Sequence, residues 1–245
     1  MFLHGPRPMS EPDDLTRLRQ EYAARQRRLA ESDRYSVFNP AHLFMIQQRQ
    51  RIALQLLRQL GFDHLNDKCI LEVGCGQGGV LLEYLAYGPS PAHLHGTDLL
   101  PDRLEEAHRR LPHLPLTCAD GQRLPYTTRA FDLVLQYTVV SSILDHKSKS
   151  NLASEMLRVL KPGGLILWYD FWINPTNPQT RGIRLGEIKA LFPSCCYYVR
   201  RVTLAPPITR CVVPISWLAG YLLEALPFLR THYLVGIRKL EDDRA

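Results

Sequence analysis

Short apolar runs that alternate with helical stretches constrain the fold of this chain more than any other feature of its sequence. The runs carry no regular polar alternation, which is typical of strands buried on both faces. Five of them lie at Cys69–Val73, Leu94–Thr97, Leu114–Cys118, Phe131–Gln136 and Leu165–Tyr169. Helical patterns lie between them, near Gly79–Tyr87, Pro101–Arg110 and Ser150–Leu160. Strands separated by helices predict an α/β fold with a doubly wound, parallel sheet covered on both faces.

The C-terminal part of the chain can complete this sheet. Proline and glycines at Lys161–Gly164 are expected to end the last of these helices before the fifth strand. Two later β-rich runs, Tyr197–Leu204 and His232–Arg238, supply two more strands. An insertion at about 171–230 then lies on one side of the domain.

The N-terminal part reads as a helical extension. Its first 34 residues are polar, with a helix expected near Asp14–Ala30, and a second helical pattern stops at Gly61. The apolar positions of that second pattern are Leu43, Ile46, Ala53, Leu54, Leu57 and Leu60. We expect an extension over residues 1–41 and a single domain over 42–245.

Composition limits the class of protein but not its chemistry. A net charge of +6 permits an anionic partner or a membrane surface without requiring either. The six cysteines show neither a CxxC pair nor a disulfide spacing, and the first residues lack a signal-peptide core, so a reduced cytoplasmic protein is expected. Val212–Leu229 is the one segment to consider as a membrane span, and Pro214, Pro227 and Glu224 argue against it.

A glycine-rich turn follows the first apolar run directly. The segment 70–79 reads Ile-Leu-Glu-Val-Gly-Cys-Gly-Gln-Gly-Gly and leads into a helix. Glycines in such a turn let a ligand approach the N–H groups at the helix N-terminus. Because Gly74, Gly76 and Gly79 also satisfy GxGxxG, the loop alone is compatible with a nicotinamide dinucleotide or with a turn that binds nothing.

Three acidic residues fall at or near the carboxyl ends of the first three predicted strands. Glu72 precedes the glycine turn, Asp98 closes the second strand, and Asp120 follows the third together with Gly121. Ligands of open α/β sheets bind at this edge, so one ligand can contact all three carboxylates. Helix capping or turn formation remains the alternative role of Asp98 and Asp120.

These motifs together resemble the class I S-adenosylmethionine (SAM) methyltransferases. The run Glu72–Gly78 is similar to the first motif of that family, and Asp98, Asp120 and Leu160–Gly164 are similar to its later motifs. The runs that begin at Arg123 and Phe131, and the helix end before Gly164, resemble the ubiquinone/menaquinone-biosynthesis-like (type 11) branch. The resemblance covers residues 69–169. It implies a seven-stranded, mostly parallel Rossmann-like sheet whose last strand is antiparallel.

The resemblance also implies which residues hold SAM, the cofactor, and S-adenosylhomocysteine, its product. Gly74, Gly76 and Gly78, with Cys75 between them, would pass under the methionine part, with Glu72 near its ammonium group. The residues implied at the remaining parts of the cofactor are Asp98 at the ribose, Leu99 at the adenine, Asp120 and Gly121 at the adenine amino group, and Gln136 and Tyr137 at the methyl end. No metal is implied.

Methyl transfer needs a base only where the acceptor must lose a proton. His146 and Tyr137 are the candidate catalytic residues, and Asp145 and His42 are further candidate bases. Tyr35 and Phe38 are expected either to close over the cofactor or to pack a helix onto the sheet.

The acceptor is expected to be a small molecule. The fourth strand ends in Leu135–Thr138 without the Asn/Asp-Pro-Pro-Tyr of adenine-amino methyltransferases, no Pro-Cys nucleophile is present, and the basic residues are scattered, so nucleic acid is not the expected partner. Aromatic residues follow the fifth strand at Trp168, Tyr169, Phe171 and Trp172. An apolar stripe flanked by arginines comes later, at Trp217, Leu218, Tyr221, Leu222 and Ala225. This stripe suits either a membrane interface that presents a lipid-linked acceptor or a helix packed on the core or on a second copy.

The sequence therefore predicts a SAM-dependent methyltransferase acting on a small molecule such as a lipid or glycan intermediate, with O-methylation favoured. Peripheral membrane contact, and a monomer or a homodimer, are compatible with it. Two alternatives stay open, a nicotinamide-dependent oxidoreductase and a SAM-binding protein without transferase activity.

Overall fold

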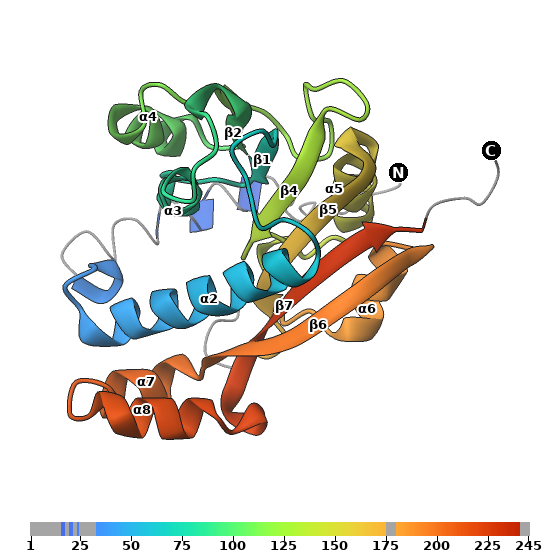
Figure 1. Cartoon of the computed structure of the whole chain (residues 1–245). Coiled ribbons are helices and arrows are strands. Elements are labelled where there is room, and N and C mark those ends of the chain that lie inside the picture. The colour runs from blue at the N-terminus through green and yellow to red at the C-terminus, as the bar shows by residue number, and fades with distance from the viewer. Residues whose placement is uncertain (1–15, 18–19, 22–23, 25–32, 175–179, 241–245) are drawn as a thin grey trace, which may run out of the picture.

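Seven strands form one mixed sheet in the order β3-β2-β1-β4-β5-β7-β6. The computed structural model describes residues 16–17, 20–21, 24, 33–174 and 180–240 (Figure 1). The strands are β1 Ile70–Val73, β2 Leu94–Asp98, β3 Leu116–Cys118, β4 Phe131–Tyr137, β5 Leu160–Phe171, β6 Cys195–Leu204 and β7 Arg230–Lys239. The first five pair in parallel with their neighbours, and β7 runs antiparallel to both β5 and β6. The predicted doubly wound sheet with an antiparallel last strand is confirmed.

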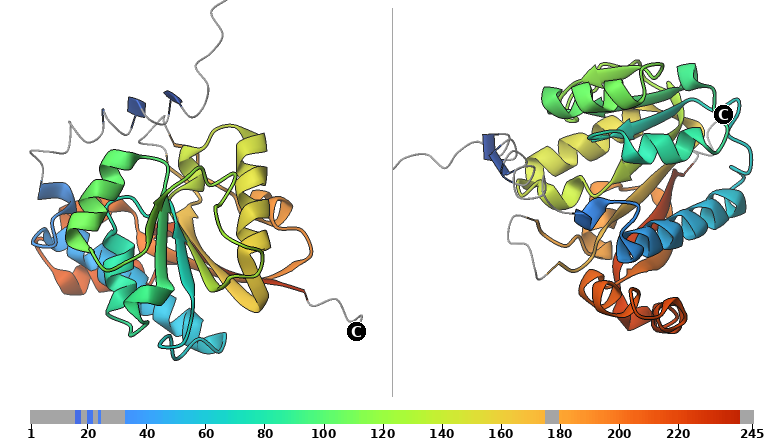
Figure 2. Two further views of the ribbon diagram at one scale, coloured as in Figure 1. Left: turned by 90° about the horizontal axis from the view of Figure 1, so that it is seen from above. Right: turned by 90° about the vertical axis from the view of Figure 1, so that its left-hand side faces the viewer.

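Helices cover both faces of this sheet (Figure 2). They are α2 Pro40–Gln59, α3 Gly79–Leu85, α4 Pro101–Arg110, α5 His146–Val159, α6 Leu185–Leu191, α7 Pro206–Val212 and α8 Trp217–Glu224, with short 3-10 turns η1 Asp33–Tyr35, η2 Pro91–His93, η3 Val140–Ser142 and η4 Pro227–Leu229. One buried cluster joins α2, α3 and α4 to one face, and a second joins α5 and α6 to the other. Burial on both faces explains why the strands read as continuous apolar runs.

Helix α2 forms where the apolar periodicity predicts it. Asn39 caps its start by accepting hydrogen bonds from the N–H groups of Ala41 and His42 at 3.1 and 3.2 Å, and Pro40 occupies the first turn. The helix stops before Gly61, whose φ of 79° lies in the left-handed region. The other predicted helix, near residues 14–30, lies largely outside the described residues.

The segment Lys161–Gly164 differs from the expected turn. Helix α5 ends at Val159, and β5 begins at the next residue and continues through this segment. Leu160 pairs with Phe131, whereas the following pair is Leu165 with Leu133, so the segment is a bulge inside β5. Asp132 holds the bulge, because it accepts hydrogen bonds from Lys161 Nζ at 2.7 Å and from the N–H of Cys69 at 2.9 Å.

The expected insertion at 171–230 contains β6, which belongs to the sheet. The helices added between the last two strands are confined to 205–229, where α7 and α8 lie below α2 (Figure 1). The candidate span at 212–229 is broken into the end of α7, helix α8 and η4. Within the part of the chain that the structure describes, no helix is long and apolar enough to cross a membrane.

Candidate functional site

The glycine turn between β1 and α3 adopts a conformation that only glycine takes easily. Gly74, Gly76 and Gly78 have φ values of 73°, 55° and 77°. The N–H groups of Gly74 and Cys75 donate to the carbonyl of Thr97 at 2.7 and 2.9 Å, which ties the turn to the end of β2. The turn therefore lies at the carboxyl edge of the sheet, as predicted.

Side chains pack closely against this turn. A Cβ atom on Gly74 would lie 2.3 Å from Val139 Cγ2, and one on Gly76 would lie 2.3 Å from Arg103 Nη2. Gly79 meets nothing within 4 Å and has no positive φ. In a dinucleotide fingerprint the third glycine of GxGxxG is needed for close helix packing. Gly79 does not have this close packing. The structure therefore favours the motif formed by Gly74, Gly76 and Gly78 over the dinucleotide fingerprint.

Asp98 joins the turn to the strand that follows it. Its Oδ2 accepts the N–H of Gly76 at 2.8 Å, and its Oδ1 accepts the N–H of Leu100 at 2.9 Å. The guanidinium of Arg103 lies 4.0 Å from the carboxylate. A carboxylate has about four acceptor positions, so the buried Asp98 can still accept from a ligand hydroxyl. Asp98 can therefore hold the turn and bind a ligand at the same time.

Glu72 is a buried carboxylate at the end of β1. Its Oε2 has no hydrogen-bond partner among the described residues. Burial raises the pKa of Glu72 well above its usual range, and nearby Glu83 raises it further. An unpaired buried acid is relieved by a cation, so this site fits a ligand that carries an ammonium group.

The residues expected at the adenine lie together at the ends of β2 and β3. The N–H of Ala119 donates to the carbonyl of Asp98 at 3.0 Å, which brings the loop after β3 beside β2. Asp120 is half-buried, and its Oδ1 accepts the N–H of Gln122 at 2.9 Å. Leu99 is also half-buried. Gly121 packs so closely on Leu152 that a Cβ would lie 2.8 Å from Leu152 Cδ1.

Gln136 is turned toward β5. Its fully buried amide donates to Asp170 Oδ2 at 3.0 Å. Asp170 also accepts the N–H groups of Ser141 and Phe171 at 3.0 and 2.8 Å, and burial raises its pKa. Gln136 and Asp170 therefore hold the loop after β4 in place. The sequence analysis missed Asp170, although an acid at the end of a strand was the signal used for Asp98.

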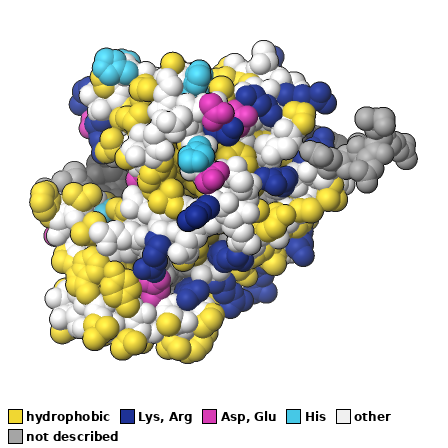
Figure 3. Space-filling model, in the orientation of Figure 1, with side chains coloured by type: hydrophobic (Ala, Val, Ile, Leu, Met, Phe, Trp, Pro, Cys, Tyr) yellow, Lys and Arg dark blue, Asp and Glu magenta, His cyan; other side chains and the backbone are white. Residues whose placement is uncertain are grey.

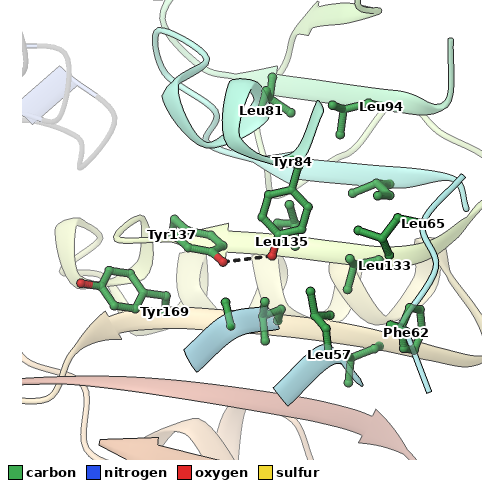
Figure 4. Close-up of a cluster of buried hydrophobic side chains, with 14 of the residues drawn as sticks. Leu57, Phe62, Leu65, Leu81, Tyr84, Leu94, Leu133, Leu135, Tyr137 and Tyr169 are labelled. Carbon is green, nitrogen blue, oxygen red and sulfur yellow. Dashed lines mark hydrogen bonds between the residues drawn. The ribbon is translucent and has the colours of Figure 1, made fainter. Parts of the chain in front are cut away.

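Tyr137 belongs to a buried group of side chains packed beside α2 (Figure 4). Its hydroxyl lies 3.1 Å from the hydroxyl of Tyr84, and its ring centroid lies 5.4 Å from that of Tyr169. Burial raises the pKa of Tyr137, so its phenol is neutral and suits positioning better than proton removal.

Arg49 is a candidate functional residue that the sequence analysis missed. Its guanidinium carbon lies 5.2 Å from the ring centroid of Tyr137 and 5.5 Å from that of Tyr169, and it forms an ion pair with Glu83 of α3. Its side chain is 16% exposed. The sequence did show that Arg49 lies within a helical apolar pattern. It did not show that Glu83, Tyr137 and Tyr169 would be the partners of this arginine.

The remaining candidates differ in their exposure to solvent. His146 is exposed at the first turn of α5, where Asp145 caps the helix by accepting the N–H of Ser148 at 2.6 Å. His42 is half-buried with its ring 5.5 Å from that of Tyr35, and burial lowers its pKa, as do Arg49 and Arg210. Burial raises the pKa of the Cys75 thiol, which keeps it neutral.

The flanking aromatics Tyr35 and Phe38 are exposed. Among the residues that the structure describes, no three His, Cys, Asp or Glu side chains gather as metal ligands do.

The part of the sequence that forms this edge of the sheet is similar to known proteins. Residues 70–164 match a family model described as "Methyltransferase domain". A phthiotriol/phenolphthiotriol dimycocerosates methyltransferase of Mycobacterium ulcerans is 36% identical over 46% of this chain and 40% of its own length. A fatty-acid O-methyltransferase of Mycolicibacterium smegmatis is 41% identical over 42% of this chain and 37% of its own length. The chain thus spans about two fifths of the length of these curated relatives.

Solved structures match over more of the chain at lower identity. The 1,6-didemethyltoxoflavin-N1-methyltransferase of Burkholderia thailandensis aligns with a TM-score of 0.62 at 15% identity, over 97% of this chain and 94% of its own. The [4+2]-cyclase SpnF aligns with a TM-score of 0.57 at 17% identity, over 80% and 83%. The second match shows that the same fold occurs in a protein named for a different reaction.

Proposed function

We propose that this chain, which matches a methyltransferase domain over residues 70–164, transfers the methyl group of SAM to an oxygen of an apolar, lipid-like acceptor. The observation that carries the cofactor proposal is the glycine turn at 74–78, fixed by Asp98 near the buried carboxyl of Glu72, whose Oε2 has no hydrogen-bond partner among the described residues. SAM supplies a methyl group already activated on a sulfonium.

The residues at this edge suit each part of that cofactor. Three glycines in the turn carry no side chains of their own and so let a ligand approach the backbone, Glu72 would face the ammonium group, and Asp98 would accept from the ribose hydroxyls. Leu99 and Asp120 would lie at the adenine. Arg103 now contacts Gly76 and would have to turn aside, which a long side chain does at little cost.

The acceptor proposal rests on the side chains around α2. Arg49 lies over the rings of Tyr137 and Tyr169 at the ends of β4 and β5 and is paired with Glu83, so a guanidinium in an ion pair lies against two aromatic rings. This combination suits an apolar molecule with a carboxylate or hydroxyl head. Relatives named for a fatty acid and for dimycocerosates support an acceptor of this class. A carboxylate needs no base, which agrees with the neutral Tyr137 phenol.

Long apolar acceptors partition into membranes. We therefore place the reaction at a membrane surface. His146 is exposed in the first turn of α5 and has no step in a carboxylate reaction.

Methyl transfer can be tested with the purified full-length chain and SAM labelled in its methyl group. Acceptors would be a long-chain fatty acid, the matching alcohol and, as control, the matching alkane. We expect label to enter the organic phase with the acid or the alcohol and not with the alkane. Binding of SAM without label transfer to any oxygen acceptor would overturn the transferase proposal and leave a SAM-binding protein.

A further inference from the structure

A row of apolar side chains is exposed on the helices added between β6 and β7. Ile215, Leu218, Leu222 and Phe228 are 87%, 69%, 65% and 71% exposed. Leu218 and Leu222 share one side of α8, Ile215 precedes the helix, and Phe228 follows it in η4. Figure 3 shows hydrophobic side chains gathered over α7 and α8 at the lower left of this face. We name these four residues the α8 patch.

The opposite side of α8 is anchored to the protein. The rings of Trp217 and Tyr221 lie 5.4 and 5.1 Å from that of Phe44 in α2, and Glu224 forms an ion pair with Arg51. Gly220 allows this approach, because a Cβ there would lie 2.9 Å from Val213 Cγ2. A helix held in this way presents the α8 patch in a fixed orientation.

The charge of the surrounding segment is strongly one-sided. Residues 180–240 contain nine Lys and Arg against two Asp and Glu, and three acids follow at Glu241, Asp242 and Asp243. Both acids within 180–240 are already paired, Glu187 with Lys149 at 2.8 Å and Glu224 with Arg51. This part of the protein therefore has no unpaired carboxylate to repel an anion.

Arginines border the α8 patch. Arg230 donates from Nε to the carbonyl of Glu224 at 2.7 Å and from Nη1 to the carbonyl of Arg201 at 3.0 Å, which links the end of α8 to β6. Arg200 and Arg201 are exposed on opposite faces of that strand, where Arg200 donates to Gln59 Oε1 at 2.8 Å and Arg201 lies 5.0 Å from the ring centroid of Trp172. On the other side, Arg210 and Pro214 line a cavity of about 290 Å³ at the start of α2.

We propose that the α8 patch and its arginine border dock the protein onto an anionic lipid surface. Exposed aliphatic and aromatic side chains on one side of a fixed helix can enter the interfacial region of a bilayer, and the arginines are attracted to acidic headgroups. A second copy would fit less well, because a symmetric contact would bring two arginine borders together. The docking is next to α2, which covers the proposed acceptor side, and it needs no methyl transfer.

Co-sedimentation with vesicles tests this docking. The full chain, without SAM, is mixed with vesicles of phosphatidylcholine alone or with phosphatidylglycerol added. We expect binding to the anionic vesicles that weakens as salt is raised, and much weaker binding to neutral ones. Leu222→Glu with Phe228→Glu should lower the binding at least tenfold, and Arg200→Gln with Arg201→Gln should remove most of the preference for phosphatidylglycerol.

The control variant is Leu54→Glu, which charges an exposed leucine of α2 outside the patch and should bind as wild type. Equal binding to both vesicle types, or wild-type binding by Leu222→Glu with Phe228→Glu, would overturn the proposal. So would a concentration-dependent dimer, seen by light scattering, that the same double variant abolishes. SAM titration of Leu222→Glu with Phe228→Glu separates the docking proposal from the proposed function. Docking can fail while SAM binding persists, and SAM binding can fail while docking persists.

Discussion

The two halves of this molecule use different means to build a site. The cofactor half, residues 70–136, relies on backbone geometry: three glycines with positive φ, a carboxylate that accepts backbone N–H groups, and strand ends. The proposed acceptor half, α2 together with Tyr137 and residues 160–240, relies on side chains from distant segments, as in Arg49 over Tyr137 and Tyr169. The family match covers 70–164 and so falls mainly on the first half. A site that depends on backbone conformation leaves a local pattern in the sequence, whereas a site built from side chains of distant segments does not.

The largest expected effect is a loss of stability when the ion pair between the two halves is broken. Arg49→Met should lower the free energy of unfolding by about 3 kcal/mol, because it leaves Glu83 in a mostly buried position without its cation. Denaturant unfolding followed by circular dichroism measures this loss. The double variant with Glu83→Gln should recover part of it. If Arg49→Met lost less than about 1 kcal/mol, the ion pair would not join the two halves.

A smaller effect tests the backbone of the cofactor half. Gly74→Ala should lower the unfolding free energy by about 2 kcal/mol, because φ is positive there and the new methyl would meet Val139. SAM affinity should fall at least tenfold. Gly79→Ala is the matched control, with open space and no positive φ, and should change stability by less than about 1 kcal/mol. Equal losses in both variants would refute the role assigned to the turn.

The next effect concerns affinity with little change of fold. Asp98→Ala should weaken SAM binding by about tenfold or more, which is about 1.4 kcal/mol, as read by calorimetry. Asp120→Ala should cost less, because that carboxylate is only half-buried and is turned to Gln122. A circular dichroism spectrum like that of wild type would show that the fold survives. Unchanged affinity in Asp98→Ala would remove this residue from the site.

The effect that is smallest near neutral pH, and that grows as pH falls, is a pH dependence in the acceptor half. Burial, together with nearby Arg49, lowers the pKa of His232 to about 3, and its ring stacks on that of Tyr169. The unfolded chain binds a proton below about pH 6.5 that the folded chain refuses. Stability should therefore fall as pH drops from about 6.5 toward 3, by up to about 1.4 kcal/mol per pH unit from this group.

The variant His232→Phe keeps a ring and removes the titration, so its unfolding free energy should depend less on pH between about 5 and 6.5. His113→Phe, at an exposed position, should keep the wild-type slope. Slopes equal to wild type in both variants would show that His232 is not the group responsible.

The sequence predicted the fold of the cofactor half well because its signals are local. Helix α4 spans Pro101–Arg110 as its periodicity and leading proline predict, and glycines 74, 76 and 78 adopt the left-handed conformations that the turn requires. The bulge at Lys161–Gly164 was not predicted, because it depends on Asp132 from another strand.

The acceptor half shows why the rest could not be predicted. Arg49 and Glu83 are 34 residues apart, and only the folded sheet brings their helices together. The stripe on α8 left two interpretations open, and the structure contains elements of both, with Trp217 packed inward and Leu218 exposed. Periodicity shows that a helix has an apolar side, but it does not show how much of that side finds a partner.

Calorimetric titration of the full chain with SAM, S-adenosylhomocysteine and NADH tests the central claim most directly. The account predicts micromolar binding of the two adenosyl ligands and no binding of NADH. Binding of NADH, or no binding of either adenosyl ligand to the folded chain, would contradict it.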